Sequence, residues 1–215
     1  MTMIKNRRMA LWLGSLLVAA AMLARLGAAA DNAPADAPAS GQLLIAAATI
    51  QDPRFYHGVI LLVRCDAKGA FGIMINRPLG ERPIADLLAG DDAAKDRDGK
   101  TAPAGGMIRV FLGGPVEPQY GFVIHSTDYR SAATVAVADG IAMTATRAIL
   151  RDIVRHRGPR QYRFAIGYSG WSAGQLDGEI ARRDWFVAPA TPDLVFDADT
   201  DRIWRTALSR RTQEL

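Results

Sequence analysis

Residues 58–76, with the sequence GVILLVRCDAKGAFGIMIN, decide the fold class of this chain. The stretch holds two apolar runs rich in β-branched residues, Gly58–Arg64 and Ala70–Asn76, joined by the short connection Cys65–Gly69. Two such runs around a connection that contains glycine predict a β-hairpin. Because both runs are almost continuously apolar, we expect other parts of the protein to cover both faces of the hairpin.

Outward from this hairpin, the sequence predicts further strands and several short helices. Apolar runs bounded by turn residues predict strands at Leu43–Ala48, Ile108–Leu112, Phe122–His125, Thr134–Ala138, Tyr162–Tyr168 and Leu194–Phe196. Apolar residues at helical spacing predict a helix at Ala145–Arg157, and further helices are expected at Ile84–Leu88 and Asp201–Arg211. A capping-box match between Ser172 and Gln175 predicts another helix that begins at Ser172. The mixed order of elements predicts an α+β fold with a mixed or mostly antiparallel sheet.

Residues 1–30 predict a signal peptide or a membrane anchor. They combine a basic start, an apolar run over residues 10–23, and the small residues Ala28 and Ala30 at the expected cleavage position. The run is shorter than the roughly 20 residues that span a bilayer, which favours a cleaved signal peptide. We therefore expect a periplasmic or membrane-anchored protein, with membrane contact through the leader, or a cytoplasmic one if the start codon is mis-assigned.

The rest of the chain predicts a linker followed by one domain. Residues 31–40 are rich in proline and alanine, so we expect a flexible linker. Residues 41–211 have the length of one domain that buries its own core. Within them, the charged and Gly/Ala-rich stretch Asp91–Gly106 predicts a mobile loop.

The charge balance argues against direct nucleic-acid binding. The chain has 26 Lys+Arg and 22 Asp+Glu, but four of the basic residues and none of the acidic ones lie in residues 1–30. The remainder is close to neutral, whereas nucleic-acid binding depends on an excess of basic residues. Arg147, Arg151 and Arg155 share one helix face, which is either a solvated surface or a patch for an anionic partner.

Two residues have the surroundings of a reactive group. Ser172 lies in the G-x-S-x-G stretch Gly170–Gly174, which is typical of a hydrolase nucleophile, but no histidine follows it in the chain and a helix cap is the simpler role. Cys65, the single cysteine, is either a buried thiol or a thiol sensor. The histidines His57, His125 and His156 are isolated from one another, so we expect no catalytic residue, no metal site and no cofactor.

Six stretches, the last of which runs from Gly167–Trp171 through Gly174–Leu176 to Glu179, together resemble the YqgE/AlgH family of bacterial proteins of poorly defined function. The other five, in order along the chain, are Gly41–Ala46, Asp52–Phe55, Gly69–Pro78, Gly113–Val116 and Gly121–His125. The resemblance implies a single compact domain with a sheet or barrel core wrapped by helices, and it brings no established catalytic residue. Family members are expected in the cytoplasm, so the leader is unusual for the family.

The matching stretches also contain the polar, aromatic and glycine residues that we expect to form a binding surface. These are Asn76, Arg77, Gly113, Gly114, Trp171, Gln175 and Glu179. The leading hypothesis is a non-catalytic binding or regulatory domain with an unknown protein or small-molecule partner. The alternatives are a purely structural role for these residues, a serine hydrolase that uses Ser172, and a thiol sensor that uses Cys65.

Overall fold

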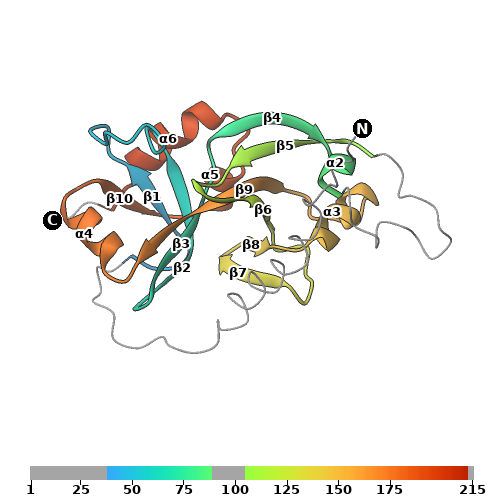
Figure 1. The fold of residues 1–215 in the computed structure, drawn as a ribbon, viewed down its shortest axis with the longest axis horizontal. Coiled ribbons are helices and arrows are strands. Elements are labelled where there is room, and N and C mark those ends of the chain that lie inside the picture. Colours follow the sequence, from blue (N-terminus) through green and yellow to red (C-terminus); the bar gives the residue numbers. More distant parts are fainter. Residues whose placement is uncertain (1–37, 89–104, 213–215) are drawn as a thin grey trace, which may run out of the picture. The chain divides into compact units, whose positions relative to one another are not determined.

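The computed structural model describes residues 38–88 and 105–212, which belong to one compact unit (Figure 1). The predicted leader, most of the predicted linker and most of the predicted loop at Asp91–Gly106 lie outside the described residues. Within the described ranges, every helix is too short or too polar to cross a membrane.

The described residues form a single, mostly antiparallel sheet. Its strands are β1 (Gln42–Ala46), β2 (Val59–Asp66), β3 (Gly69–Met74), β4 (Pro78–Pro83), β5 (Met107–Leu112), β6 (Val116–Ser126), β7 (Thr134–Ala138), β8 (Ile141–Thr144), β9 (Tyr162–Ser172) and β10 (Trp185–Pro189). The main path runs β10-β1-β2-β3-β9-β6-β8-β7, and β4 joins it through β5. The β5–β9 pairing is parallel and the other pairings are antiparallel, which confirms the predicted α+β class and sheet type.

The helices do not wrap the sheet, so that part of the expectation is wrong. They are α2 (Ile84–Leu88), α3 (Arg147–Val154), α4 (Gln175–Ala181), α5 (Pro192–Val195) and α6 (Thr200–Ser209). The longest of these has 10 residues, and each covers only a short stretch of the strands (Figure 1). The sheet instead buries its own apolar side chains by curling into a half-barrel.

Three local predictions are wrong, each for a physical reason. Leu194–Phe196 is not a strand, because Pro192 opens a helical turn that makes α5. The helix expected over Ala145–Arg157 is shorter, since Thr144 ends strand β8 and Thr146 precedes α3. Ser172 does not begin a helix, because it ends β9 and Gly174 precedes α4.

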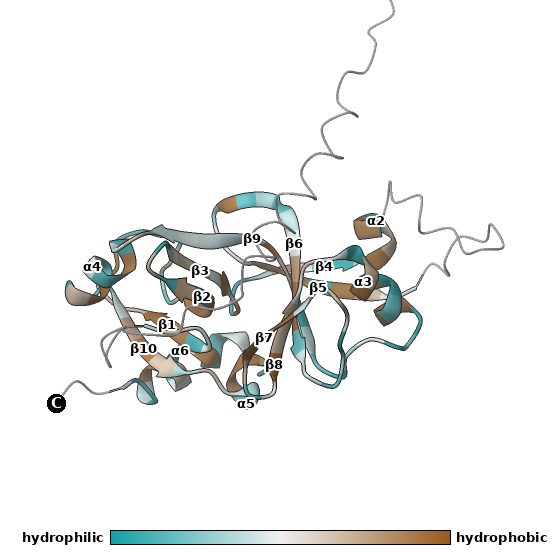
Figure 2. Ribbon diagram, turned by 90° about the horizontal axis from the view of Figure 1, so that it is seen from below, coloured by the Kyte–Doolittle hydropathy of each residue, from teal (hydrophilic) through white to brown (hydrophobic). Residues whose placement is uncertain are grey.

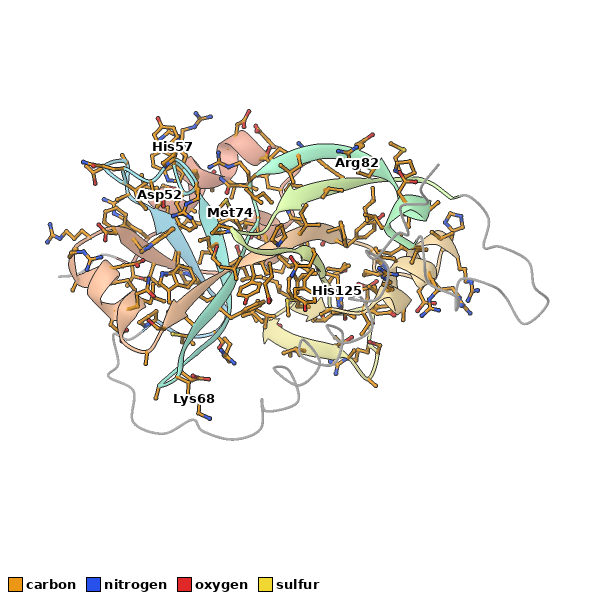
Figure 3. The ribbon with its side chains drawn as sticks, viewed as in Figure 1. Asp52, His57, Lys68, Met74, Arg82 and His125 are labelled. Carbon is orange, nitrogen blue, oxygen red and sulfur yellow. The ribbon has the colours of Figure 1, made fainter. Side chains whose placement is uncertain are left out.

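The hairpin that decides the fold is formed by β2 and β3. Val59–Val63 are buried along their whole length, as expected for a strand covered on both faces. A Cβ atom on Gly72 would lie 2.5 Å from Cγ2 of Ile60, so glycine there allows the two strands to pack closely. At the turn, the Asp66 carboxylate accepts a hydrogen bond of 2.8 Å from the Lys68 backbone N–H, and Figure 3 shows Lys68 at the tip.

Strand β9 joins two separate groups of buried apolar side chains. Its end near Trp171 packs with β1, β2, β3, α4 and β10, in a group that we call the first core. Its beginning near Phe164 packs with α2, β5, β6 and α3, in a group that we call the second core. Figure 2 shows the hydrophobic colouring concentrated on the strands, with hydrophilic residues on the connecting loops and on parts of the helices.

Arg163 is a buried cation near the start of β9. Its guanidinium donates to the backbone carbonyls of Val195 and Asp197, at the end of α5, and lies 4.6 Å from the centre of the Phe111 ring. Burial, with a smaller contribution from Arg109, lowers the pKa of Arg163 to about 10, so the side chain is still charged at pH 7. Arg163 therefore anchors the segment that follows β10 to the sheet.

We predict that Arg163→Met destabilises the protein by about 2 kcal/mol, because a buried carbonyl group, that of Val195, and a partly buried one, that of Asp197, lose their donor. Urea unfolding followed by circular dichroism measures the change. Arg205→Met is the matched control: Arg205 is exposed on α6, and we expect its replacement to change stability by less than about 0.5 kcal/mol. Equal effects of the two substitutions would show that Arg163 does not anchor α5.

Candidate functional site

Asn76 and Arg77 hold the loop formed by residues 51–58, which we call the 51–58 loop. The Asn76 side chain donates to the carbonyl of His57 at 2.8 Å and accepts from the Val59 N–H at 2.9 Å. The Arg77 guanidinium donates to the carbonyl of Tyr56 at 2.7 Å. Both predicted site residues therefore act on the backbone of this loop.

The 51–58 loop is also fixed from within. Asp52 accepts from the Arg54 backbone N–H and pairs with its guanidinium, with a shortest N–O distance of 2.6 Å. The hydrogen bond from Arg54 holds the pKa of Asp52 below its usual value. His57 adopts a φ of 52°, which is uncommon for a residue other than glycine and which the bonds from Asn76 and Arg77 maintain.

Three rings stack on one another at this loop. The Tyr56 and His57 rings lie 3.9 Å apart, and the His57 and Trp204 rings also lie 3.9 Å apart. Trp204, from α6, is fixed by a hydrogen bond from its indole N–H to the carbonyl of Ala46 at 2.8 Å. Tyr56 is the outermost ring, and 52% of its surface is exposed. Figure 3 shows Asp52 and His57 at the end of the hairpin opposite Lys68.

Trp171, Gln175 and Glu179 form a second group, together with Trp185. One carboxylate oxygen of Glu179 accepts from the indole N–H of Trp171 and from that of Trp185, each at 2.8 Å. The other oxygen accepts from the Gln175 amide at 2.9 Å. Glu179 thus gives two largely buried indoles the hydrogen-bond acceptor that they need.

An aromatic contact joins the two groups. The Phe55 ring, from the 51–58 loop, meets the Trp185 ring edge-on at 5.4 Å, and Trp185 in turn contacts Trp171 at 6.0 Å. Phe55, Trp185 and Trp204 were not among the predicted site residues. Little in the sequence pointed to these three residues. Phe55 lies in a stretch that carries the family resemblance, and a buried tryptophan implies a hydrogen-bond acceptor for its indole N–H.

Gly113 and Gly114 are required by close packing of backbone against backbone. A Cβ atom on Gly113 would lie 2.3 Å from the carbonyl oxygen of Gly167. One on Gly114 would lie 2.2 Å from the carbonyl carbon of Tyr168. Both glycines therefore sit at the crossing of the β5–β6 connection over β9, away from the 51–58 loop contacts.

Ser172 has neither the backbone nor the partners of a nucleophile elbow. Its hydroxyl donates to the Gln175 side chain at 3.1 Å, and the same side chain accepts from the Ser172 backbone N–H at 3.1 Å. Among the described residues, no histidine hydrogen-bonds to Ser172. Its geometry is that of a strand end tied to the following helix.

Cys65 lies partly buried in β2, against the first core. Burial raises the pKa of its thiol, and the carboxylates of Asp177 and Asp66 raise it further. The environment therefore disfavours the thiolate, which is the reactive form.

The described histidines stay apart. His57 is in the aromatic stack, His125 is fully buried in β6, and His156 is exposed after α3. Within the described ranges, no three or more His, Cys, Asp or Glu side chains gather as a metal site.

Comparison with known proteins identifies the family. The model of the AlgH-like family matches residues 43–215. The chain belongs to the AlgH-like family. A UPF0301 protein of Methylococcus capsulatus is 43% identical over 172 residues, which cover 80% of this chain and 91% of that protein. A UPF0301 protein of Methylobacterium nodulans is 42% identical over 177 residues, which cover 81% and 84%. The resemblance to YqgE/AlgH proteins is thereby confirmed.

Solved structures share the AlgH-like fold. The solution structure of AlgH from Pseudomonas aeruginosa has a TM-score of 0.65 and 30% identity, and the match covers 85% of this chain and 92% of that one. A crystal structure of a Corynebacterium diphtheriae protein has a TM-score of 0.64 at 21% identity and shows the fold alone, with 84% and 91% covered. The curled sheet is thus common to both.

We predict that Glu179→Gln destabilises the protein by about 1–3 kcal/mol, because one amide oxygen replaces a carboxylate that accepts from three donors. Thermal unfolding and the near-ultraviolet signal of the tryptophans measure the loss. Glu81→Gln, the same exchange on the exposed strand β4, serves as the control. An unchanged melting temperature in Glu179→Gln would contradict a structural role for the carboxylate.

We predict that Cys65 of the folded protein reacts with a maleimide more slowly at pH 7 than Cys65 of the urea-unfolded protein. Its raised pKa leaves less thiolate at that pH, and burial limits access. The rate in the folded protein should keep rising as the pH passes the usual pKa of a cysteine. A folded rate that equals the unfolded one at pH 7 would instead support the thiol sensor.

Proposed function

We propose that this AlgH-like chain is a non-catalytic binding domain that recognises a protein partner through the 51–58 loop and its ring stack. One observation supports the proposal: half of the Tyr56 side chain is exposed, and its ring is held in place by stacking on His57, which stacks on Trp204.

The support around the loop favours binding because it lowers the entropic cost of association. Asn76 and Arg77 hold the backbone at His57 and Tyr56, and Phe55 is packed against Trp185. Ordering a loop on binding costs free energy, and a loop that is already ordered avoids much of that cost. The predicted residues Asn76 and Arg77 therefore contribute indirectly, as positioning residues.

The residue types at this surface favour a protein as the partner. Tyr56, Trp204 and the exposed Arg54 belong to the three residue types that are most enriched at the energetic centres of protein interfaces. Tyrosine offers a large rigid surface with few rotatable bonds, and arginine adds directional hydrogen bonds. With the leader of residues 1–30 acting as predicted, the partner would be a protein of the cell envelope.

A photo-crosslinking experiment in the host tests the proposal. A benzoylphenylalanine at position 56 keeps an aromatic ring on the stack, and one at position 107 reports on a surface that lies on β5. Met107 is 55% exposed, so the two positions are matched in accessibility. We expect a discrete crosslinked species from position 56 that is absent from position 107.

A second substitution makes the result specific. Arg54→Ala in the position-56 variant removes a charged contact next to the ring together with its exposed ion pair to Asp52, so we expect a weaker crosslink and a loss of stability below about 1 kcal/mol. The proposal fails if both positions capture the same species, or if position 56 captures none under conditions in which the variant is folded.

A further inference from the structure

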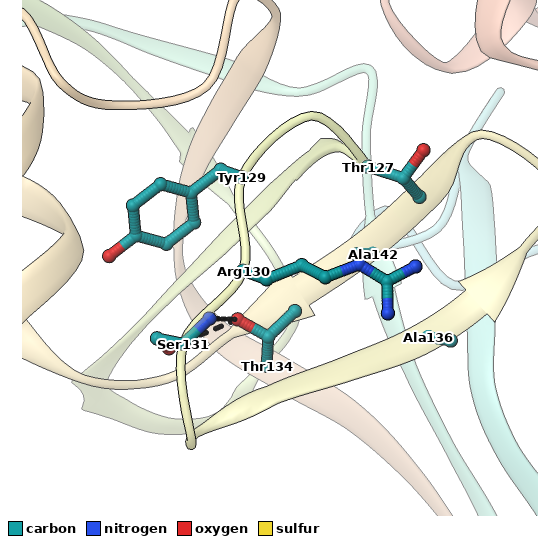
Figure 4. A pocket seen from close by; sticks show the side chains of 7 residues that line it. All are labelled: Thr127, Tyr129, Arg130, Ser131, Thr134, Ala136 and Ala142. Carbon is teal, nitrogen blue, oxygen red and sulfur yellow. Dashed lines mark hydrogen bonds between the residues drawn. The ribbon is translucent and has the colours of Figure 1, made fainter.

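A separate pocket opens beside strands β7 and β8, away from the residues of the 51–58 loop. Its volume is about 180 Å³, it is open to solvent on one side, and Figure 4 shows the side chains that line it. The lining residues are Thr127, Tyr129, Arg130, Ser131, Thr134, Ala136 and Ala142. Four hydroxyl-bearing side chains and one arginine therefore surround a space large enough for a small polar group.

A chain of hydrogen bonds fixes one wall of this pocket. The buried His125 contacts the carbonyl of Ser126 through Nδ1 and the hydroxyl of Thr144 through Nε2, each at 2.9 Å. Thr144 contacts the hydroxyl of Thr134 at 2.8 Å, and Thr134 contacts that of Ser131 at 3.0 Å. The chain thus leads from the core of the protein to two residues that line the pocket.

The directions of these bonds follow from His125. Nδ1 faces a carbonyl, so it carries the proton, and burial lowers the pKa of His125, so the ring is neutral at pH 7. Nε2 must then accept from Thr144, which must accept from Thr134. The proton of the Thr134 hydroxyl is therefore used inside the wall and is not available to a ligand.

The hydroxyl proton of Tyr129 is also used in a hydrogen bond within the protein. Its hydroxyl donates to the carboxylate of Asp152, on α3, at 2.8 Å. Burial and this carboxylate raise the pKa of Tyr129 to about 12, so the phenol keeps its proton at physiological pH. Tyr129 shapes the pocket with its ring.

Arg130 and Thr127 are the donors that remain. Arg130 is exposed and Thr127 is half-buried, and within the described residues neither the Arg130 guanidinium nor the Thr127 hydroxyl bonds to another side chain or carbonyl. Figure 4 shows the Arg130 side chain extending across the pocket in the direction of Thr127 and Ala136. The neighbouring carboxylate of Asp128 is already engaged, since it accepts from the Ser126 hydroxyl and from the Arg160 backbone N–H.

The stretch of sequence that supplies the pocket lining is rich in arginine, although Arg163 at its end is buried against the α5 segment. Residues 127–163 contain seven arginines and three aspartates, and no lysine or glutamate. Two of those aspartates, Asp128 and Asp152, are paired with Arg160 and Arg157. An excess of positive charge raises the local concentration of anions and increases their association rate.

We infer that this pocket is a binding site for a small oxyanion, the phosphate or carboxylate group of a small molecule, with Arg130 and Thr127 as its ligands. A guanidinium binds either group through two parallel N–H···O bonds, and the threonine hydroxyl adds a third. Thr134 is saturated, because its hydroxyl donates to Thr144 and accepts from the Ser131 hydroxyl and backbone N–H, so the fixed wall offers a hydroxyl or amine of the same molecule only the Ser131 oxygen as an acceptor. This site is independent of the surface in the proposed function.

An NMR titration tests the site with two probes, inorganic phosphate and acetate, at constant ionic strength and with the protein in the form that its host produces. We expect saturable shifts at the backbone amides of Thr127, Arg130, Ser131 and Ala142. Saturation by phosphate alone identifies a phosphate group as the ligand, and saturation by acetate alone identifies a carboxylate.

Three variants separate a specific site from general attraction of anions. Arg130→Gln should weaken binding by about tenfold or more, and Thr127→Val by a few-fold, because each removes a bond to a charged group. Arg155→Gln, an exposed arginine of the predicted basic stripe, should leave the affinity within about twofold. The inference is overturned if neither anion saturates, if binding survives Arg130→Gln, or if Arg155→Gln weakens it as much.

Discussion

Strand β9 pairs with three neighbouring strands at once, and the rest of the structure depends on the register that this requires. Its first part pairs with β6 and, in parallel, with β5, while its last part pairs with β3. Because side chains alternate along a strand, a shift of one residue would turn every buried side chain of β9 toward the wrong face. Arg163 at one end and Trp171 at the other are each fixed by hydrogen bonds that only one register allows.

Glycines make that register possible. Gly167 has a φ of 69°, and a Cβ atom there would lie 2.5 Å from the carbonyl oxygen of Gly114. The β5–β6 connection therefore crosses β9 in direct backbone contact. This crossing gives a structural reason for glycine at positions 113 and 114.

The sequence predicted the strands best where packing alone decides the structure. The β2–β3 hairpin and most of β1, β5 and β9 follow from apolar runs that are largely buried on folding. Strands β4, β8 and β10 escaped prediction for different reasons. β4 is exposed and contains prolines at both ends, and β8 is a run of four residues that ends where the helix Ala145–Arg157 was predicted to begin.

The predicted site residues were only partly understood from the sequence. Their polar and aromatic character indicated a common surface, and the structure does bring Trp171, Gln175 and Glu179 together. Those side chains, however, use their hydrogen bonds on one another and on the backbone. Tyr56 carried no comparable signal, because an exposed tyrosine in a loop becomes distinctive only when its stacking partners from distant elements are known.

The two proposed binding surfaces rest on different cores, and this affects how they respond to substitution. The 51–58 loop is anchored through Phe55 and Trp185 in the first core, whereas Tyr129 of the oxyanion pocket belongs to the second. Substitutions without shared contacts have nearly additive effects on stability and binding. Coupling between the surfaces would have to pass through β9, and its fixed register argues against a second arrangement of that strand. An AlgH-like domain of this kind would bind a protein and a small anion independently.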